Sequence, residues 1–257
     1  MIIVSSSLLR KKDVSDLLHQ QSPLKRTLRT IDLTFLGIGV IIGTGIFVLT
    51  GKGALTAGPA LSVSFLIAGI CCGFAALCYA EFASMAPISG SAYTYSYIAF
   101  GEIIAFIIGW DLILEYSLAT ATVSAGWSGY LISLLDDFGI HIPTVLTAAA
   151  GTTAGVTTYF NLPAFLIILF LTWIVSIGIT QTKEVNNVMV TIKIGVVLLF
   201  IVCTVWYVKT ANWHPFSPFG WYSYHSGTAT GIIPAASIVF FSFIGFDAVS
   251  SSAEETI

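Results

Sequence analysis

The sequence predicts an all-α protein that crosses a membrane several times and in which two of the crossing helices are interrupted. Its 257 residues are 56% hydrophobic and only 9% charged, and their mean hydropathy is +0.92. Soluble domains carry about 25% charged residues, so this composition excludes an ordinary soluble domain. The interruptions are indicated by glycine-containing stretches within apolar runs, at residues 39–47 and 241–247.

Six apolar runs follow a polar leader, and each is close to the ~20 residues that a helix needs to cross a membrane. We take residues 1–32 as a cytoplasmic leader and residues 33–257 as one transmembrane domain. The expected spans are 33–49, 59–80, 103–135, 164–182, 185–208 and 227–253. Residues 142–161, rich in Thr, Ala and Gly, are expected to form a loop with room for a short surface helix. Residues 89–95 are expected to belong to an internal loop and gate region.

The distribution of cations predicts the orientation of the chain. The leader carries a cluster of basic residues, whereas the later loops hold single cations. The positive-inside rule then places the N-terminus in the cytoplasm, and we expect a multi-pass protein of the cell membrane. No basic patch of the nucleic-acid-binding kind occurs, and the cysteines and histidines lack metal-binding spacing. We therefore expect the lipid bilayer as a partner, and no nucleic acid, metal or cofactor.

The first apolar run contains Gly39, Gly43 and Gly45 within seven positions. Each costs roughly 1 kcal/mol relative to alanine in a helix. They are explained if the helix is interrupted there, because backbone groups set free at membrane depth must face protein, a cavity or a ligand. Secondary transporters build their substrate sites in this way. Close helix packing through small residues explains the glycines equally well.

An interruption here would expose both kinds of backbone group. The N–H groups of Thr44 and Gly45 would lie at the positive end of the restarting helix, where a carboxylate binds favourably. The carbonyl groups near Ile41 and Ile42 would hold an ammonium group. The first run therefore predicts a binding site with one charged end of each sign.

The last apolar run shows a second interruption, at Gly245, followed by Asp247 and a cluster of serines. An aspartate inside a membrane segment costs about 2.5–3.5 kcal/mol on insertion scales, which makes it a candidate functional residue. Alternatively, Asp247 lies near the cytoplasmic end of its span or caps the restarting helix. Capping the helix and serving a site are compatible.

Three further charged residues lie inside expected spans. Asp111 and Glu115 share one helix face at spacing i,i+4. Two like charges in a dry place are not readily ionised together, so one should hold a proton or a cation should lie nearby. The pair could carry protons, attract a cationic substrate or bond to interrupted backbone. Lys193 is either a buried ammonium that exchanges a proton or a side chain that reaches back to the headgroups.

Three stretches, at residues 39–47, 87–93 and 243–256, resemble the amino acid–polyamine–organocation transporters, in particular bacterial members of the cationic amino acid transporter subfamily. The resemblance implies a five-plus-five inverted-repeat fold of the leucine-transporter type. The first repeat would comprise spans one to five, and span six would begin the second. Because members of the superfamily carry further spans after the sixth, the chain resembles the N-terminal half of a permease.

The resemblance also implies roles for individual residues. The residues that would hold the substrate's amino acid backbone are Ile41, Ile42, Thr44, Gly45, Phe241, Ser242 and Ile244. Lys193 looks like the lysine that replaces a sodium ion in proton-coupled relatives, and Glu115 is similar to the acid near the substrate. The residues themselves add two candidate charged groups, Asp111 and Asp247, and the helix-breaking glycines Gly39, Gly43 and Gly245.

The sequence therefore predicts an amino acid transporter, not an enzyme, that carries a cationic or neutral amino acid by symport with protons. Amino acid exchange remains an alternative. A non-transporting remnant is a further alternative, since the chain lacks most of the second repeat. An intramembrane aspartyl protease is disfavoured, because paired catalytic aspartates share one proton whereas Asp247 lies late in its span.

Overall fold

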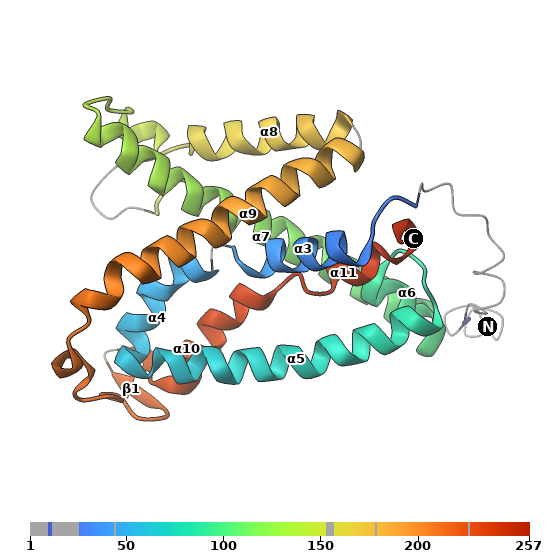
Figure 1. Ribbon diagram of the computed structural model, residues 1–257, viewed down its shortest axis with the longest axis horizontal. Coiled ribbons are helices and arrows are strands. Elements are labelled where there is room, and N and C mark those ends of the chain that lie inside the picture. Colours follow the sequence, from blue (N-terminus) through green and yellow to red (C-terminus); the bar gives the residue numbers. More distant parts are fainter. Residues whose placement is uncertain (1–9, 12–25, 44, 153–156, 178, 226) are drawn as a thin grey trace. The chain divides into compact units, whose positions relative to one another are not determined.

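The computed structural model describes residues 10–11, 26–43, 45–152, 157–177, 179–225 and 227–257 (Figure 1). These residues form two compact units. The first unit comprises Met1–Leu112 and Val185–Ile257, and the second comprises Ile113–Glu184. Both units are mainly helical, as the sequence predicts, and each is described by itself.

The first unit contains both interrupted segments. Its helices are α3 (Thr30–Ile41), α4 (Thr50–Ala57), α5 (Leu61–Met85), α6 (Ser91–Ala99), the start of α7 (Glu102–Asp137), most of α9 (Ile179–Thr204), α10 (Ile232–Phe240) and α11 (Ala248–Ser251). Between them lie short turns of tighter or wider helix, namely η1 (Gly45–Leu49), η2 (Gly58–Ala60), η4 (Val205–Tyr207), η5 (Thr210–Trp213), η6 (Phe241–Phe243) and η7 (Ala253–Glu255). Strands β1 (Ser223–His225) and β2 (Thr228–Thr230) form an antiparallel hairpin in which Ser223 pairs with Thr230.

The second unit contains the rest of α7, the turn η3 (Thr144–Leu146) and helix α8 (Leu162–Ile177). Asn161 links these elements. Its side-chain oxygen accepts a 2.7 Å hydrogen bond from the Ser128 hydroxyl on α7 and a 3.1 Å hydrogen bond from the Ala164 N–H in the first turn of α8. The expected loop at 142–161 is a loop, and its described residues contain η3 as their only helical turn.

Four helical runs in the described part of the chain are long and apolar enough to cross a membrane. They are Thr30–Met85, Glu102–Asp137, Glu184–Tyr207 and Ile232–Ser251. The first run contains both the first and the second expected spans. The fourth expected span, 164–182, corresponds to α8, which has only 16 residues and ends at Ile177. The expected break between the fourth and fifth spans, at 183–184, lies inside α9, because a helix satisfies its own backbone whatever its side chains.

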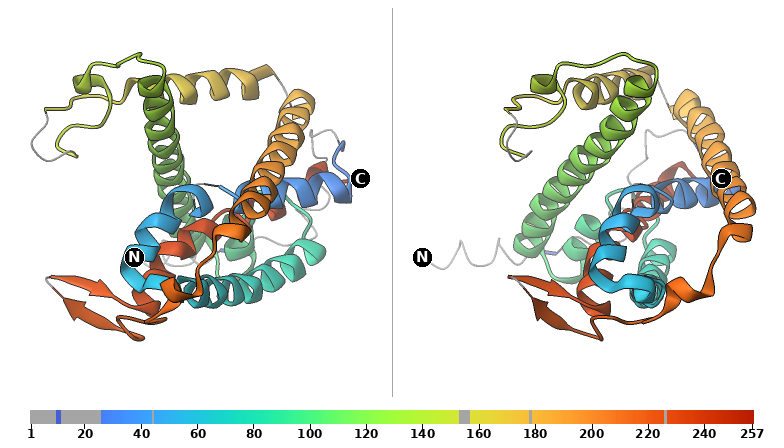
Figure 2. Two further views of the ribbon diagram at one scale, coloured as in Figure 1. Left: turned by 60° about the vertical axis from the view of Figure 1, so that its left-hand side comes forward. Right: turned by 90° about the vertical axis from the view of Figure 1, so that its left-hand side faces the viewer.

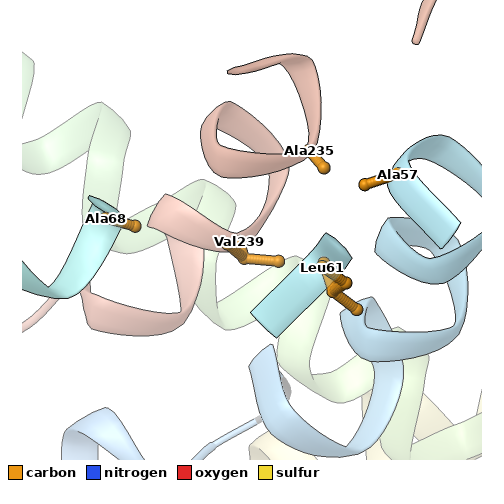
Figure 3. Close-up of a cluster of buried hydrophobic side chains, with 5 residues drawn as sticks. All are labelled: Ala57, Leu61, Ala68, Ala235 and Val239. Atoms are coloured by element: carbon orange, nitrogen blue, oxygen red, sulfur yellow. The ribbon is translucent and has the colours of Figure 1, made fainter. Parts of the chain in front are cut away.

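Small side chains bring α4, α5 and α10 together at one end of the first unit. The buried cluster there consists of Ala57, Leu61, Ala68, Ala235 and Val239 (Figure 3). Helices in lipid associate mainly through van der Waals packing and interhelical hydrogen bonds, and small residues allow the backbones to come close. The fully buried Ser64 adds such a bond, since its hydroxyl donates to the Ile232 carbonyl at 2.8 Å.

The two ends of the first unit are held in different ways. At what we call the hairpin end, the loop before α10 folds over α4 and η2, and Gly231 N–H donates to the Thr56 carbonyl at 2.8 Å. At the opposite end, which we call the α6 end, the segment before α3 pairs with the segment after α11. Leu28 N–H donates to the Glu255 carbonyl, and Ile257 N–H donates to the Leu28 carbonyl, both at 2.9 Å. Helix α5 runs from one end to the other (Figure 1).

Candidate functional site

The first predicted interruption is present between α3 and η1. The last regular bond of α3 joins Ile42 N–H to the Ile38 carbonyl at 2.9 Å, and Gly43 N–H turns back to the Ile41 carbonyl at 3.0 Å. In a continuous helix Gly43 would bond to the Gly39 carbonyl, four residues back. The break therefore sets the Gly39 carbonyl free inside an apolar segment.

The second predicted interruption lies between η6 and α11. Helix α10 passes into η6, and the backbone of Ile244 then leaves the helical conformation, with φ −58° and ψ 135°. Gly245 has φ +103°, a left-handed conformation that glycine adopts without steric cost, and a Cβ at this position would overlap the Val40 side chain. The interruption therefore depends on glycine both for its turn and for its contact with α3.

The two interruptions meet. A Cβ on Gly45 would overlap the backbone and side chain of Ser242, so the absence of a side chain at residue 45 allows η1 and η6 to touch. Ser242 is only 5% exposed, and its hydroxyl has no hydrogen-bond partner among the described residues. A buried polar group without a partner costs about 1–3 kcal/mol, which marks the contact as a place where a polar ligand would be stabilised.

Lys193 supports the first interruption from α9. Its Nζ donates a 2.7 Å hydrogen bond to the carbonyl of Gly39, the group that the break sets free. Gly39 itself lies inside α3 rather than at the break, and a Cβ there would come within 2.8 Å of Val190 Cγ2 and 3.0 Å of Asn186 Oδ1. The role of this glycine is thus to let α9 pass close beside α3 (Figure 2).

The three predicted acids lie in different surroundings. Asp247 is 6% exposed and accepts a 3.2 Å hydrogen bond from the Ser91 hydroxyl. Asp247 stands at the N-cap position of α11, as one interpretation of the sequence has it, but its side chain makes no capping hydrogen bond there. Asp111 is exposed on α7, and Glu115 is half-buried in the second unit.

The remaining predicted residues lie at or beside the breaks. Thr44 lies outside the described residues. Ile41 and Ile42 form the end of α3, while Phe241 and Ser242 belong to η6 and Ile244 follows it. The Phe241 carbonyl accepts the Ile244 N–H at 3.3 Å, which leaves it one further lone pair.

Sequence reasoning missed the polar partners of α11. Ser91 and Ser250 bond to Asp247, and Glu254 accepts a hydrogen bond from Ser89 N–H at 2.9 Å. The Ser89–Ser91 stretch stood out in the sequence but suggested no chemistry. What distinguishes this stretch is a backbone angle that the sequence does not reveal. Ser91 is the one non-glycine residue in the described chain with a positive φ, +48°.

Comparison with known proteins decides the family. The family model described as amino acid permease matches residues 28–257. The chain belongs to the amino acid permease family. This match confirms the resemblance inferred from the motifs. It also rules out the alternative that the protein is an intramembrane protease.

Individual relatives in the family carry different substrate names. The chain is 57% identical to the branched-chain amino acid permease BcaP of Bacillus subtilis, over 98% of this chain and 53% of the relative. It is 53% identical to the methylthioribose transporter of the same organism, over 97% and 53%. It is 38% identical to cationic amino acid transporter 9 of Arabidopsis thaliana, over 91% and 40%. The chain thus spans about half the length, or less, of these relatives.

Replacing Gly45 with alanine tests the contact between the interruptions. The new methyl group would push η1 away from Ser242, and overpacking of this kind costs about 1–3 kcal/mol. We expect Gly45→Ala to lower the unfolding temperature of the detergent-solubilised protein. The matched control is Gly51→Ala on α4, where a Cβ meets nothing within 4 Å. Equal stability of the two variants would show that the interruptions do not touch.

Proposed function

We propose that the protein is an amino acid permease that carries its substrate across the cell membrane together with protons. The observation that carries this proposal is the contact of two interrupted segments at Gly45 and Ser242. Interrupted helices that meet at membrane depth present main-chain donors and acceptors to one small volume. An amino acid has a charged group of each sign close together, which such a volume matches.

The substrate carboxylate is assigned to the start of η1. The first N–H groups of a helix have no partner within it, and the helix dipole makes this end positive. Gly45 begins η1, and the hydroxyl of Ser242, which has no hydrogen-bond partner in the described part of the chain, lies against it, so both can donate to one carboxylate. Thr44 N–H is proposed as a further donor.

The substrate ammonium is assigned to carbonyl groups on the other side of the breaks. The last carbonyls of a helix lack its regular i+4 partners and lie at its negative end. The Ile41 and Phe241 carbonyls each accept one N–H, from Gly43 and Ile244, and each keeps a second lone pair. Ile41 and Ile42 end α3, while Phe241, Ser242 and Ile244 end the first half of the last span. Their carbonyls are the proposed acceptors.

The substrate is proposed to be a neutral, branched-chain amino acid. Residues 41–45 and 241–245 contain no charged side chain that could pair with a cationic one. The exposed position of Asp111 also weakens the argument that it attracts a cationic substrate. The relative named as a branched-chain amino acid permease supports the same choice, with 57% identity.

Protons are proposed to act through Lys193. A protonated amine donates strongly to the Gly39 carbonyl and so fixes the end of α3 beside the substrate. Loss of the proton weakens this bond and frees the end of α3, which couples the proton to the shape of the site.

The cations of the leader are proposed to face the cytoplasm, which places the α6 end inside and the hairpin end outside.

The direct test is uptake by the full-length protein in sealed liposomes. We expect labelled isoleucine to accumulate when the outside is made acidic, and unlabelled isoleucine to compete far better than arginine. Accumulation of arginine instead would make the substrate cationic. Uptake that needs a preloaded amino acid and ignores the proton gradient would make the protein an exchanger.

Replacing Ser242 with alanine separates its role in binding from a role in folding. Because the hydroxyl is buried and has no partner among the residues that the structure describes, its removal should leave the unfolding temperature unchanged or raise it. If the hydroxyl holds the carboxylate, isoleucine affinity should fall by about tenfold, equal to about 1.4 kcal/mol. Both quantities can be measured on one purified sample. Unchanged affinity would remove the hydroxyl from the site.

Replacing Lys193 with alanine tests the coupling. We expect the variant to lose uptake driven by a proton gradient, because no side chain then links a proton to the Gly39 carbonyl. The control is Lys209→Ala, which removes an exposed cation from the segment between η4 and η5. Proton-driven uptake in the Lys193 variant equal to that of the control would contradict the role given to Lys193.

A further inference from the structure

Polar side chains follow the boundary between α3 and α9. In the first turn of α3, Asp32 is 8% exposed, and its Oδ1 accepts a 3.3 Å hydrogen bond from Asn187 Nδ2 on α9. Two turns further along α3, the Gly39 carbonyl accepts the 2.7 Å bond from Lys193 Nζ. Asn186, the neighbour of Asn187, reaches this second contact, since its Oδ1 lies 3.0 Å from the place of a Cβ on Gly39. Adjacent amides on α9 thus join a carboxylate to an amine.

These side chains lie in segments that are apolar enough to cross a membrane. Asp32 belongs to the candidate span Thr30–Met85, and both asparagines belong to the candidate span Glu184–Tyr207. Ionisable and polar side chains inside spans are costly and commonly mark ion or proton pathways. Helix capping accounts for one oxygen of Asp32, since Oδ2 accepts the Arg29 N–H at 2.9 Å. It does not account for the other oxygen, which bonds to α9.

The Asn187 amide is only half satisfied. Its Nδ2 donates to Asp32, whereas its Oδ1 is buried and has no hydrogen-bond partner among the described residues. A buried acceptor of this kind costs about 1–3 kcal/mol unless it is paired. Water satisfies such groups where two to four polar atoms surround it, and the Asp32 carboxylate and the Asn186 amide lie close by. The boundary between α3 and α9 therefore suits bound water.

Few other charged groups lie on the elements that contact α3. Helix α11 and the turn η6 have no charged residue, and α9 carries Lys183 and Glu184 at its start besides Lys193. The turn η7 carries Glu254, which accepts the Ser89 N–H, and Glu255. Burial and the neighbouring Glu254 raise the pKa of Glu255. Asp32 is thus an acid that lies on the same helix boundary as Lys193.

We propose that Asp32 receives the proton that leaves Lys193 and releases it to the cytoplasm, through water held by Asn186 and Asn187. The inference rests on the proposed function, in which Lys193 exchanges the proton, and it adds the acid through which this proton leaves. Asp32 lies at the end of α3 that follows the leader, and the leader is proposed to face the cytoplasm.

The transfer balances in charge and in protons. An N–H bond of the Lys193 ammonium breaks, the proton passes along the water, and an O–H bond forms on the Asp32 carboxylate. Water is needed because two turns of helix separate the two contacts by roughly 10 Å. The products are an amine and a carboxylic acid, both uncharged, which an apolar environment favours over two separated charges. Asp32 then loses its proton to the cytoplasm and regains its charge.

Replacing Asp32 with asparagine tests this route in the full-length protein in liposomes. The new amide oxygen can still accept the Arg29 N–H, but the side chain cannot take up a proton. We expect exchange of labelled for unlabelled isoleucine to continue, because exchange needs no net release of protons. Accumulation driven by a proton gradient should be lost, and Asp32→Glu, which keeps the carboxyl group, should restore it. The matched control is Glu81→Gln, which removes an exposed acid from α5.

Proton-driven accumulation in Asp32→Asn equal to that of the Glu81 control would overturn the route. So would a variant that binds isoleucine but loses exchange together with accumulation, because Asp32 would then serve the movement of the helices. An unaltered protein without proton-driven uptake would instead overturn the proposed coupling.

If Asp32→Asn fails to bind isoleucine, Asn187→Leu decides, since it removes the amide and leaves the bond from Arg29 to Asp32 in place. We expect this variant to slow proton-driven accumulation several times more than it slows exchange. Accumulation that slows no more than exchange would overturn the route.

Discussion

The structure depends on the contact between two stretches of backbone that have left their helices. In lipid, an unsatisfied backbone group costs several kcal/mol, so an interrupted span needs support from within the protein. Lys193 supplies that support at the Gly39 carbonyl, and Gly45 supplies it by letting η1 close against Ser242. The buried hydroxyl of Ser242 remains without a hydrogen-bond partner among the described residues, and a polar substrate would supply one.

The first unit combines an end packed by aliphatic side chains with an end held by both hydrogen bonds and aromatic contacts. The apolar cluster around Leu61 and Val239 fixes α4 and α10 against α5. At the other end Ser91 bonds to Asp247, and the Tyr79 ring contacts the rings of Tyr95 and Phe246. Both interruptions lie between these ends.

Local sequence was enough to predict some of these features. Glycines inside apolar runs predicted both interruptions, and the composition predicted a multi-pass helical protein. Lys193 was singled out because a cation in a span is costly. Its bond to Gly39 was not predicted, because a pairing between residues 154 positions apart leaves no local pattern. For the same reason Gly39 was assigned to the break, although it makes room for α9.

The contact between Ser91 and Asp247 and the helix boundaries were beyond local reasoning. Ser91 reads as an ordinary loop residue until its left-handed φ and its distant partner Asp247 are known. The boundary between the expected spans 164–182 and 185–208 falls within α9, which continues from Ile179 to Thr204. Hydropathy locates a span but does not locate where its helix stops, because the backbone of a helix is satisfied on both sides of the membrane boundary.

The most direct measurement is competition between labelled isoleucine and two analogues, each of which lacks one charged end. N-acetylisoleucine has no ammonium group, and isoleucinol has no carboxylate. If main-chain groups hold both the ammonium and the carboxylate, neither analogue should displace labelled isoleucine from the full-length protein at concentrations where unlabelled isoleucine displaces it fully. Displacement by either analogue at the concentration needed for isoleucine itself would contradict the backbone-held site.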